Sequence, residues 1–298
     1  MFASLAGAGS AAELTPIKIA TIPLEPVAAT FYAKHRGMFR KQGLDADVKL
    51  FDSPAQTVPA LLSGQVQFTA THIGAAAALT SQGAPVKIVA AGATYDPKKP
   101  SSALIAAPGR SITRARDLVG KTVAIDFPKT IADVGVREWL EKSGVDQDDV
   151  KFTSIPFTQA LGPLLDGTVD AAIVPEPYRT IALLQGATRI AYPFQAVCQK
   201  VCLLTVYLAR ADVDPNVVAR FRNAIQKASL WANDNKNDQT SVRILAKYVP
   251  GIDARVRERM TRTTFGTRLR VSLAAPWLPV FAKYGVIPAS FKPIDLVK

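Results

Sequence analysis

The sequence predicts an α/β protein with two lobes, in which each lobe is a mainly parallel β-sheet flanked by helices. Strand-like and helix-like segments alternate from Ile17 onward, as they do in parallel sheets. One phrase occurs twice, at residues 61–68 and 164–171: a leucine-rich helix end, a glycine, a short turn and an apolar strand. A chain of 298 residues is also long for one hydrophobic core and natural for two.

Residues 17–91 contain the elements of a first lobe. Ser53 precedes Pro54, which is the usual order of a helix cap and a first helical residue, and Gly43 ends the preceding helix. The lobe is therefore predicted as a complete βαβαβαβ unit. Its predicted strands are 17–22, 46–51, one that begins at Phe68, and 86–91, and its predicted helices are 27–42, 54–64 and 74–82.

Residues 102–209 contain the second lobe, entered through the apolar segment 102–107 and left through the apolar strand 201–209. The second lobe is thus predicted as an insertion within the first. The crossings at 102–107 and 203–208 would form a hinge that closes around a ligand. The other predicted elements are a short helix at 116, a strand that ends at Asp126, a helix at 131–143, a strand at 150–155, and helices at 217–235, 240–247, 254–265 and 276–284.

The domain boundaries follow from these crossings. Residues 14–104 and 206–298 are assigned to lobe one, and residues 105–205 to lobe two. Residues 1–13 are predicted to be the remnant of a secretory signal, because they are small and apolar with Ala-x-Ala-like cleavage options. No run of the sequence approaches the ~20 apolar residues of a membrane-spanning helix.

The chain is basic, with 36 Lys and Arg against 24 Asp and Glu and a formal net charge of +12. Its basic residues are spread singly except at residues 255–262, which read either as a solvated helix face or as a contact with an anionic surface. No RNA-binding, zinc-finger or helix-turn-helix pattern accompanies the charge, so nucleic acid is not an expected partner. A positive field would favour small anions weakly.

Cys198 and Cys202 are the only cysteines. In an exported protein an even count favours a structural disulfide that closes a tight loop, and inert thiols are the alternative. Three residues separate the pair, whereas thioredoxin-like chemistry requires two. His35 and His72 are the only histidines, so a zinc site would lack ligands and no metal is expected.

Five ordered segments carry a family resemblance: residues 31–39 (FYAKHRGMF), 61–68 (LLSGQVQF), 83–89 (GAPVKIV), 117–124 (DLVGKTVA) and 170–177 (DAAIVPEP). Together they resemble the type 2 periplasmic binding proteins of ABC transporters, and among them the nitrate, sulfonate, taurine and thiamine-precursor binders. The resemblance implies a periplasmic or exported monomer, membrane-associated through the transporter, that delivers a small molecule to a permease without a cofactor.

One position departs from the family pattern. The first copy of the repeated phrase has Gln67 where the family often carries Asp, while the second copy keeps Asp170. This difference argues against a structural role for a carboxylate in lobe one and leaves the expected fold unaffected.

Ligands of open α/β sheets bind beyond the carboxyl ends of the strands. Several of these corners are also helix starts, whose free N–H groups attract anions, and the resemblance implies ligand contacts at the same corners. The expected ligand-binding residues are Leu24, Glu25, Ser53, Thr71, His72, Ile73, Thr94 and Tyr95 in lobe one, and Phe127, Lys129, Thr130, Phe157, Glu176 and Tyr178 in lobe two.

Most of these residues also have a plainer interpretation. Ser53 and Thr130 could cap their helices without contacting a ligand, and His72 could make a structural hydrogen bond. Lys129 could point to solvent instead of supplying a charge. The aromatic residues could stack on a ring of the ligand or simply pack in the core.

These features predict the solute-binding component of an ABC importer, which captures a small organic anion such as a sulfonate or carboxylate between its lobes. No Ser-His-Asp spacing, P-loop or metal triad is found, so no catalytic residue is expected. The alternative is an enzyme on the same fold, of the menaquinone-pathway or pyrimidine-precursor type, although the cysteine-rich motif of the pyrimidine synthase is absent. A ligand-sensing regulator would need a DNA-binding segment, and none is found.

Overall fold

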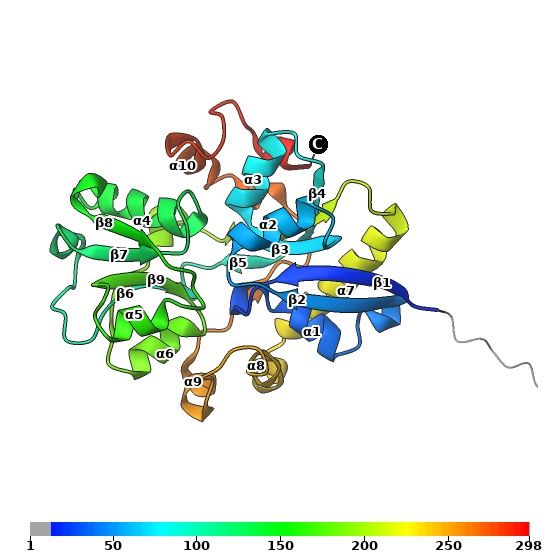
Figure 1. The fold of residues 1–298 in the computed structure, drawn as a ribbon, viewed down its shortest axis with the longest axis horizontal. Coiled ribbons are helices and arrows are strands. Elements are labelled where there is room, and N and C mark those ends of the chain that lie inside the picture. The colour runs from blue at the N-terminus through cyan, green and yellow to red at the C-terminus, as the bar shows by residue number, and fades with distance from the viewer. Residues whose placement is uncertain (1–12, 298) are drawn as a thin grey trace, which may run out of the picture.

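The structure is a computed structural model that describes residues 13–297, and it has two lobes side by side (Figure 1). A five-stranded sheet lies at the centre of each lobe, with helices on both of its faces (Figure 1). The predicted two-lobed α/β class is therefore confirmed. The predicted signal remnant lies outside the described residues, apart from Glu13.

The sheet of lobe one has the strand order β2-β1-β3-β12-β4. Strands β1, β2 and β3 pair in parallel, while β12 pairs antiparallel with both β3 and β4. Four of the five strands thus run in one direction, and β12 is reversed. The bounds are β1 (Thr15–Thr21), β2 (Leu44–Leu50), β3 (Phe68–His72), β4 (Val86–Ala91) and β12 (Thr205–Arg210).

The sheet of lobe two has the order β10-β6-β9-β7-β8, in which only β6 is reversed. Reading from the other edge gives β8-β7-β9-β6-β10, so the two sheets share one topology. In each lobe the reversed strand is the one that follows a crossing between the lobes. The bounds are β6 (Ser102–Ala106), β7 (Thr122–Ile125), β8 (Lys151–Ser154), β9 (Ala171–Pro175) and β10 (Thr188–Ala191).

The repeated phrase forms the same unit in both lobes. Helix α2 (Pro54–Leu62) leads into β3, and helix α5 (Leu161–Leu165) leads into β9, the central strands of the two sheets. The turns contain Gly64 with φ 81° and Gly167 with φ 79°, a backbone region that only glycine enters cheaply. The sequence prediction for this phrase is confirmed.

Gln67 and Asp170 make equivalent hydrogen bonds. The Gln67 Oε1 atom accepts the Lys18 N–H at 2.7 Å, and the Asp170 Oδ2 atom accepts the Thr122 N–H at 2.9 Å. Both bonds tie the residue before a central strand to the neighbouring parallel strand, at Lys18 within β1 and at Thr122 at the start of β7. Lobe one thus keeps the hydrogen bond without a carboxylate, because an amide oxygen accepts a backbone N–H as a carboxylate does.

The remaining helices lie mostly where the sequence predicts them, with two exceptions. Residues 27–42 are not one helix, because Gly37 has φ 65° and separates α1 from a short 3₁₀ turn, η2 (Arg40–Gln42). Residues 254–265 are not one helix either, because Met260 is extended. The bounds are α1 (Ala29–His35), α3 (Ile73–Ser81), α4 (Ile131–Lys142), α6 (Tyr178–Leu184), α7 (Pro215–Ala232), α8 (Asp238–Leu245), α9 (Ala254–Arg259) and α10 (Leu278–Lys283).

The predicted crossings at 102–107 and 203–208 are misplaced. Residues 102–106 are β6, inside the sheet of lobe two, and β12 begins at Thr205 inside the sheet of lobe one. Both segments are apolar and buried, and this sequence pattern does not distinguish a strand within a sheet from a connection between lobes. A small sheet beside the crossings joins β5 (Ala93–Tyr95), β11 (Cys202–Leu203) and β13 (Thr264–Phe265). The domain division itself stays a prediction, and its boundary at residue 104 falls within β6.

Hydrophobic packing continues from one lobe to the other. One buried cluster contains Ile73 of α3, Phe281 of α10 and Val134 of α4, together with Phe194. In Figure 1, α10 lies between α3 of lobe one and α4 of lobe two. The lobes therefore share a packed contact in addition to the crossings between them.

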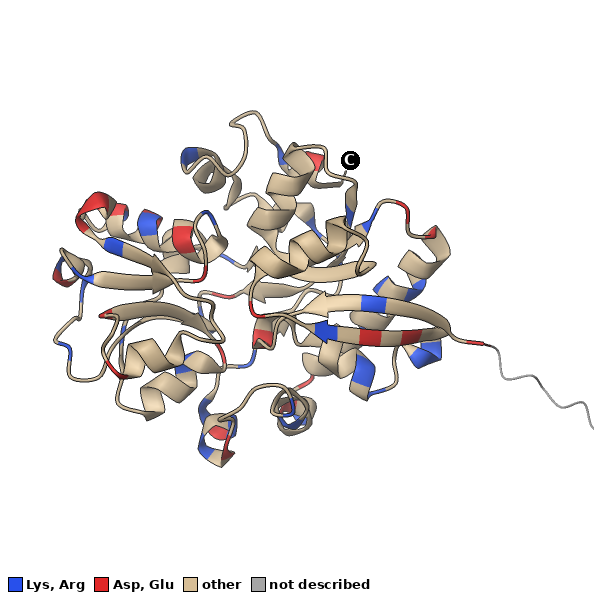
Figure 2. Cartoon of the chain, in the orientation of Figure 1, with Lys and Arg blue, Asp and Glu red and all other residues tan. Residues whose placement is uncertain are grey.

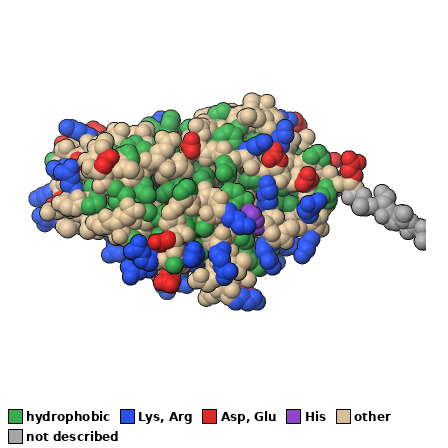
Figure 3. All heavy atoms as spheres, turned by 60° about the horizontal axis from the view of Figure 1, so that its bottom comes forward, with side chains coloured by type: hydrophobic (Ala, Val, Ile, Leu, Met, Phe, Trp, Pro, Cys, Tyr) green, Lys and Arg blue, Asp and Glu red, His purple; other side chains and the backbone are tan. Residues whose placement is uncertain are grey.

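Cys198 and Cys202 form a disulfide, which confirms the favoured interpretation of their spacing. Figures 2 and 3 show Lys and Arg side chains spread over both lobes rather than gathered on one element. Within the basic run, Arg255 pairs at the surface with Asp253, whereas Arg262 is mostly buried. Among residues 13–297, no helix is long and apolar enough to cross a membrane.

Candidate functional site

A cavity lies between the two sheets, at the carboxyl ends of their parallel strands. The space open to the centre of a water molecule is ≈ 70 Å³, several times the roughly 10–15 Å³ that one water requires. The wall is formed by Ile22, Leu24, Pro26, Val27, Pro54, Ala70, Thr71, His72, Leu204 and Thr205 from lobe one and its connections, and by Ser102, Asp126, Ile131, Ala132, Phe157, Ile173, Pro175 and Phe194 from lobe two and its connections.

The shared topology of the sheets explains this wall. Strands β3 and β9, which follow the two copies of the repeated phrase, end at His72 and Pro175. The reversed strands begin at the same level, because Thr205 pairs with His72 and Ser102 pairs with Pro175. Each lobe therefore presents the end of its central strand and the start of its reversed strand to the cavity.

His72 is a neutral hydrogen-bond donor on this wall. Its Nδ1 atom accepts the Ala75 N–H at 3.0 Å and so caps α3. Because an acceptor nitrogen carries no proton, the ring proton must be on Nε2. Burial lowers the pKa of His72 to about 4, so the ring is neutral at pH 7. The helix cap thus fixes the tautomer that carries a donor on Nε2.

Thr71 is the second polar group from lobe one. Its Oγ1 atom is buried and has no hydrogen-bond partner among the described residues, although the residue lines the cavity. An unpartnered buried hydroxyl costs roughly 1–3 kcal/mol. A bound molecule that hydrogen-bonds this hydroxyl would remove that cost.

Asp126 is the titratable group that lobe two adds to the wall. It follows β7 directly, is 2% exposed, and its Oδ1 atom accepts a hydrogen bond from the Thr130 hydroxyl. Burial, with a smaller contribution from Asp133, raises the pKa of this carboxyl to about 7, although the hydrogen bond from Thr130 lowers it. Sequence reasoning missed Asp126, although it lies one residue before a segment that was included, at the strand end where such sites form.

The starts of two helices also face the cavity. His72 caps α3, and Ile131 and Ala132 are the first residues of α4. The unpaired N–H groups and the dipole of a helix start stabilise a negative charge by roughly 0.3–1 kcal/mol each. Among the described residues, no Lys or Arg lines the cavity. Any anion bound here would be held by N–H and O–H donors rather than by an ion pair.

Four of the predicted ligand-binding residues lie on the wall: Leu24, Thr71, His72 and Phe157. Ser53 and Thr130 are buried at the starts of α2 and α4 beside it, and the Thr130 hydroxyl serves Asp126 and the helix cap. The Ser53 side chain makes no cap hydrogen bond. The cap interpretation therefore describes Thr130 and not Ser53.

Several other predicted residues have contacts away from the cavity. The Lys129 ammonium donates to the Gly285 carbonyl at 3.2 Å, and the Phe127 side chain is 46% exposed. Thr94 donates to the Thr264 carbonyl across the small sheet. The remaining buried ones are core residues that do not line the cavity: Ile73, Tyr95 and Tyr178.

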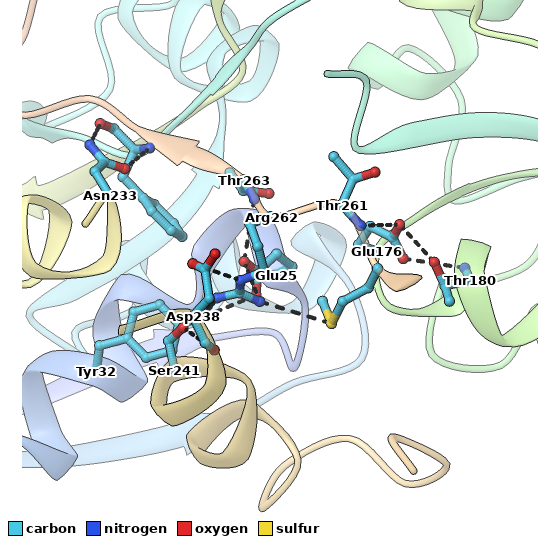
Figure 4. A network of polar contacts seen from close by, with 12 residues as sticks. Glu25, Tyr32, Glu176, Thr180, Asn233, Asp238, Ser241, Thr261, Arg262 and Thr263 are labelled. Atoms are coloured by element: carbon cyan, nitrogen blue, oxygen red, sulfur yellow. Dashed lines mark hydrogen bonds and ion pairs between the residues drawn. The ribbon is translucent and has the colours of Figure 1, made fainter. Parts of the chain in front are cut away.

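Glu25 and Glu176 form buried ion pairs rather than cavity contacts. Glu25 lies 2.9 Å from the Arg262 guanidinium, and Glu176 lies 2.7 Å from that of Arg179. The segment that contains Thr261 links the two pairs, since the Thr261 N–H donates to Glu176 at 3.0 Å (Figure 4). The Glu25 N–H also donates to the Glu176 carbonyl at 3.2 Å. These residues hold the lobes together beside the cavity.

Within residues 13–297, no group of three or more His, Cys, Asp or Glu side chains is placed to hold a metal ion. The polar side chains of the wall are Thr71, His72, Ser102, Asp126 and Thr205, and no two of them are hydrogen-bonded to each other as a nucleophile and a base would be. The arrangement can bind a small molecule through donors at one end and apolar contacts at the other.

Comparison with known proteins gives a consistent family and fold. The NMT1/THI5-like family profile matches residues 26–238, and no curated protein sequence matches the chain. Similar structures include a ligand-binding component of an ABC-type import system from Staphylococcus aureus, solved with zinc bound. That protein is 14% identical, with a TM-score of 0.80 over 95% of this chain and 96% of that one.

Two further structures have stated ligands. The alkanesulfonate-binding protein SsuA from Xanthomonas axonopodis pv. citri, bound to MOPS, is 18% identical, with a TM-score of 0.73 over 93% of this chain and 96% of that one. The periplasmic nitrate-binding protein NrtA from Synechocystis PCC 6803 is 18% identical, with a TM-score of 0.75 over 94% of this chain and 84% of that one. At these identities the similarity shows the fold.

Proposed function

Because the chain belongs to the NMT1/THI5-like family, we propose that it is the solute-binding component of an ABC importer. The observation that carries the proposal is the cavity itself, since both lobes contribute to its wall. The structures of import-system, sulfonate-binding and nitrate-binding proteins with the same fold support it. The proposal includes export, a monomeric state and delivery of the solute to a permease.

The proposed solute is a small organic anion with an apolar body. The Nε2–H of His72, the Thr71 hydroxyl and the start of α4 offer donors to an anionic end. The side chains of Phe157, Phe194 and Ile173 offer apolar contacts to the rest of the molecule. Since no Lys or Arg of the described residues lines the wall, we expect moderate affinity, in the submicromolar to micromolar range.

The alternative is an enzyme on the same fold. The wall of the cavity contains one carboxyl and one neutral imidazole from different lobes. An enzyme of this kind would need a base within hydrogen-bond distance of a reacting group, and Asp126 is already bonded to Thr130. We therefore expect every bound compound to be recovered chemically unchanged.

A thermal-shift screen tests the proposal. The panel contains propane-1-sulfonate, benzenesulfonate, benzoate and the uncharged analogue benzamide. A ligand at 100 times its dissociation constant stabilises the protein by about 2.7 kcal/mol, which raises Tm by about 4 °C for a chain of this length. We expect the anions to shift Tm and benzamide not to. A shift by benzamide alone would contradict the anion assignment, and conversion of any compound, detected by mass spectrometry, would favour the enzyme.

A further inference from the structure

Asp126 creates an electrostatic conflict with an anionic solute. It lies on the cavity wall with Phe157 and Ile173, and its carboxyl is almost fully buried. If the carboxyl and the solute were both ionised, two negative charges would share an apolar cavity whose described wall has no Lys or Arg. Like charges that share a buried site do not both remain ionised, because one of them takes up a proton.

The charged groups of lobe two do not resolve this conflict. On α4, Asp133 is negative and already paired with Arg137, whose Nε atom is 2.6 Å from its Oδ1 atom. The Lys129 ammonium, on the loop between β7 and α4, is bound to the Gly285 carbonyl. Beyond β9, Glu176 is paired with Arg179. None of these cations faces the Asp126 carboxyl.

Lobe one brings no positive charge to the cavity either. Its titratable group on the wall is His72, whose Nδ1 atom accepts the Ala75 N–H. Protonation of Nδ1 would break that helix cap, so the ring stays neutral. His72 can donate one hydrogen bond to an anion, but it cannot neutralise Asp126.

We propose that the anion binds together with one proton, which resides on Asp126 and makes this carboxyl a hydrogen-bond donor to the solute. This inference rests on the proposed function, because it takes the solute to be an anion. In the bound state one carboxyl oxygen still accepts the Thr130 hydroxyl, and the protonated oxygen donates to the anion. Asp126 from lobe two and His72 from lobe one then hold the same anionic end from opposite lobes. A solute that carries a donor or a cation would instead favour the ionised carboxylate.

The expected size of the effect follows from the fraction of protein that is competent to bind. Burial raises the pKa of Asp126 to about 7, so this fraction falls about tenfold between pH 6 and pH 8. The dissociation constant of an anion should rise by the same factor. A solute that needs the carboxylate should show the opposite trend.

The test uses benzenesulfonate and benzoate, which do not titrate between pH 6 and pH 8, in calorimetric titrations of three proteins. These are the wild type, Asp126→Asn and Asp149→Asn. An Asn side chain imitates the protonated acid, because its carbonyl can accept from Thr130 and its NH₂ group can donate to the anion. Asp149 is exposed in the same lobe, and its carbonyl bonds to Gly120 at the other end of the sheet from the cavity.

We expect the wild type and Asp149→Asn to bind about tenfold more weakly at pH 8 than at pH 6. Asp126→Asn should bind the anions equally tightly at pH 6 and pH 8, and more tightly than the wild type does at pH 8. If Asp126 only anchored Thr130, its amide variant would lose affinity at every pH and keep the pH dependence, which would overturn the inference. A wild-type affinity that is independent of pH would overturn it too.

Measurements on the wild type alone decide the question if Asp126→Asn does not fold. Titrations at pH 8 in buffers of different ionisation enthalpy report the protons taken up on binding. An uptake close to one proton supports the inference, and no uptake or a release overturns it while leaving the proposed function intact. Failure of both anions to bind at pH 6 would overturn the anion assignment and, with it, the inference.

Discussion

Replacement of Arg262 by Met tests how much the buried ion pair with Glu25 contributes to stability. The Arg262 guanidinium lies 2.9 Å from Glu25 and donates to the Tyr32 hydroxyl at 3.0 Å and to the Ser241 hydroxyl at 2.7 Å (Figure 4). Glu25 has no exposed surface. Met has a similar length and no charge, so Arg262→Met leaves a fully buried carboxylate without its cation.

The expected loss is large because the remaining charge is buried. Removing one partner of a buried ion pair costs about 3–5 kcal/mol, which lowers Tm by about 5–8 °C for a chain of this length. The double variant Glu25→Gln/Arg262→Met should recover part of this loss, since it removes the stranded charge. Arg255→Met is the matched control, because Arg255 pairs with Asp253 at the surface, where ion pairs contribute little.

The loss should also depend on pH. Burial raises the pKa of Glu25, and Arg262 opposes this rise. Without Arg262 the folded-state pKa rises further above its unfolded value. The stability that such a group contributes is fully present below the unfolded pKa and is lost as the pH rises through the folded pKa. The deficit of Arg262→Met should therefore grow from pH 5 to pH 8.

Urea denaturation followed by far-ultraviolet circular dichroism measures these free energies at each pH. The reasoning would be refuted by a loss no greater than that of Arg255→Met, or by a deficit that shrinks as the pH rises. Retention of the full loss in the Glu25→Gln double variant would show that packing of the Arg262 stem, rather than the stranded charge, causes it.

Three further changes have expected outcomes. Thr71→Val removes an unpartnered buried hydroxyl, so urea denaturation should show the ligand-free variant to be at least as stable as the wild type. Calorimetric titration should show that it binds anions about fivefold to tenfold more weakly. A loss of stability with unchanged binding would contradict this prediction. Gly167→Ala should lower the free energy of unfolding by about 1–2 kcal/mol, because φ is 79° at this residue. The control Gly162→Ala, on α5 with open space around the new methyl group, should stabilise the protein slightly. Equal effects of the two changes would contradict the turn argument. Replacing Cys198 and Cys202 with Ala should cost about 2 kcal/mol, the loop entropy of a short disulfide, and reducing agent should then leave the variant's Tm unchanged.

The fold could be predicted largely because the chain repeats itself. The glycine turns at Gly64 and Gly167 mark a helix end and a central strand in each lobe. The crossings could not be placed in the same way. Residues 102–106 and 205–210 are buried apolar strands, and apolar strands in a sheet and apolar connections have the same sequence pattern.

The site could be predicted only where it follows directly from a strand end. Thr71 and His72 close β3 and lie on the cavity wall. Glu25 and Glu176 occupy similar corners, but Arg262 and Arg179 pair with them. Arg262, the partner of Glu25, is far away in the sequence, and no local sequence pattern predicts the pairing. Lys129 shows the same limit, because its ammonium bonds to the carbonyl of Gly285, which is 156 residues away in the sequence.

The central claim is that an anionic solute binds between the lobes at Thr71, His72 and Asp126. A crystal structure of the protein with benzenesulfonate at pH 6 tests it most directly. We predict that a sulfonate oxygen lies within hydrogen-bond distance of His72 Nε2 and of the Asp126 carboxyl, with the ring against Phe157 and Phe194. An empty cavity at a saturating concentration, or benzenesulfonate bound elsewhere on the protein, would contradict the claim.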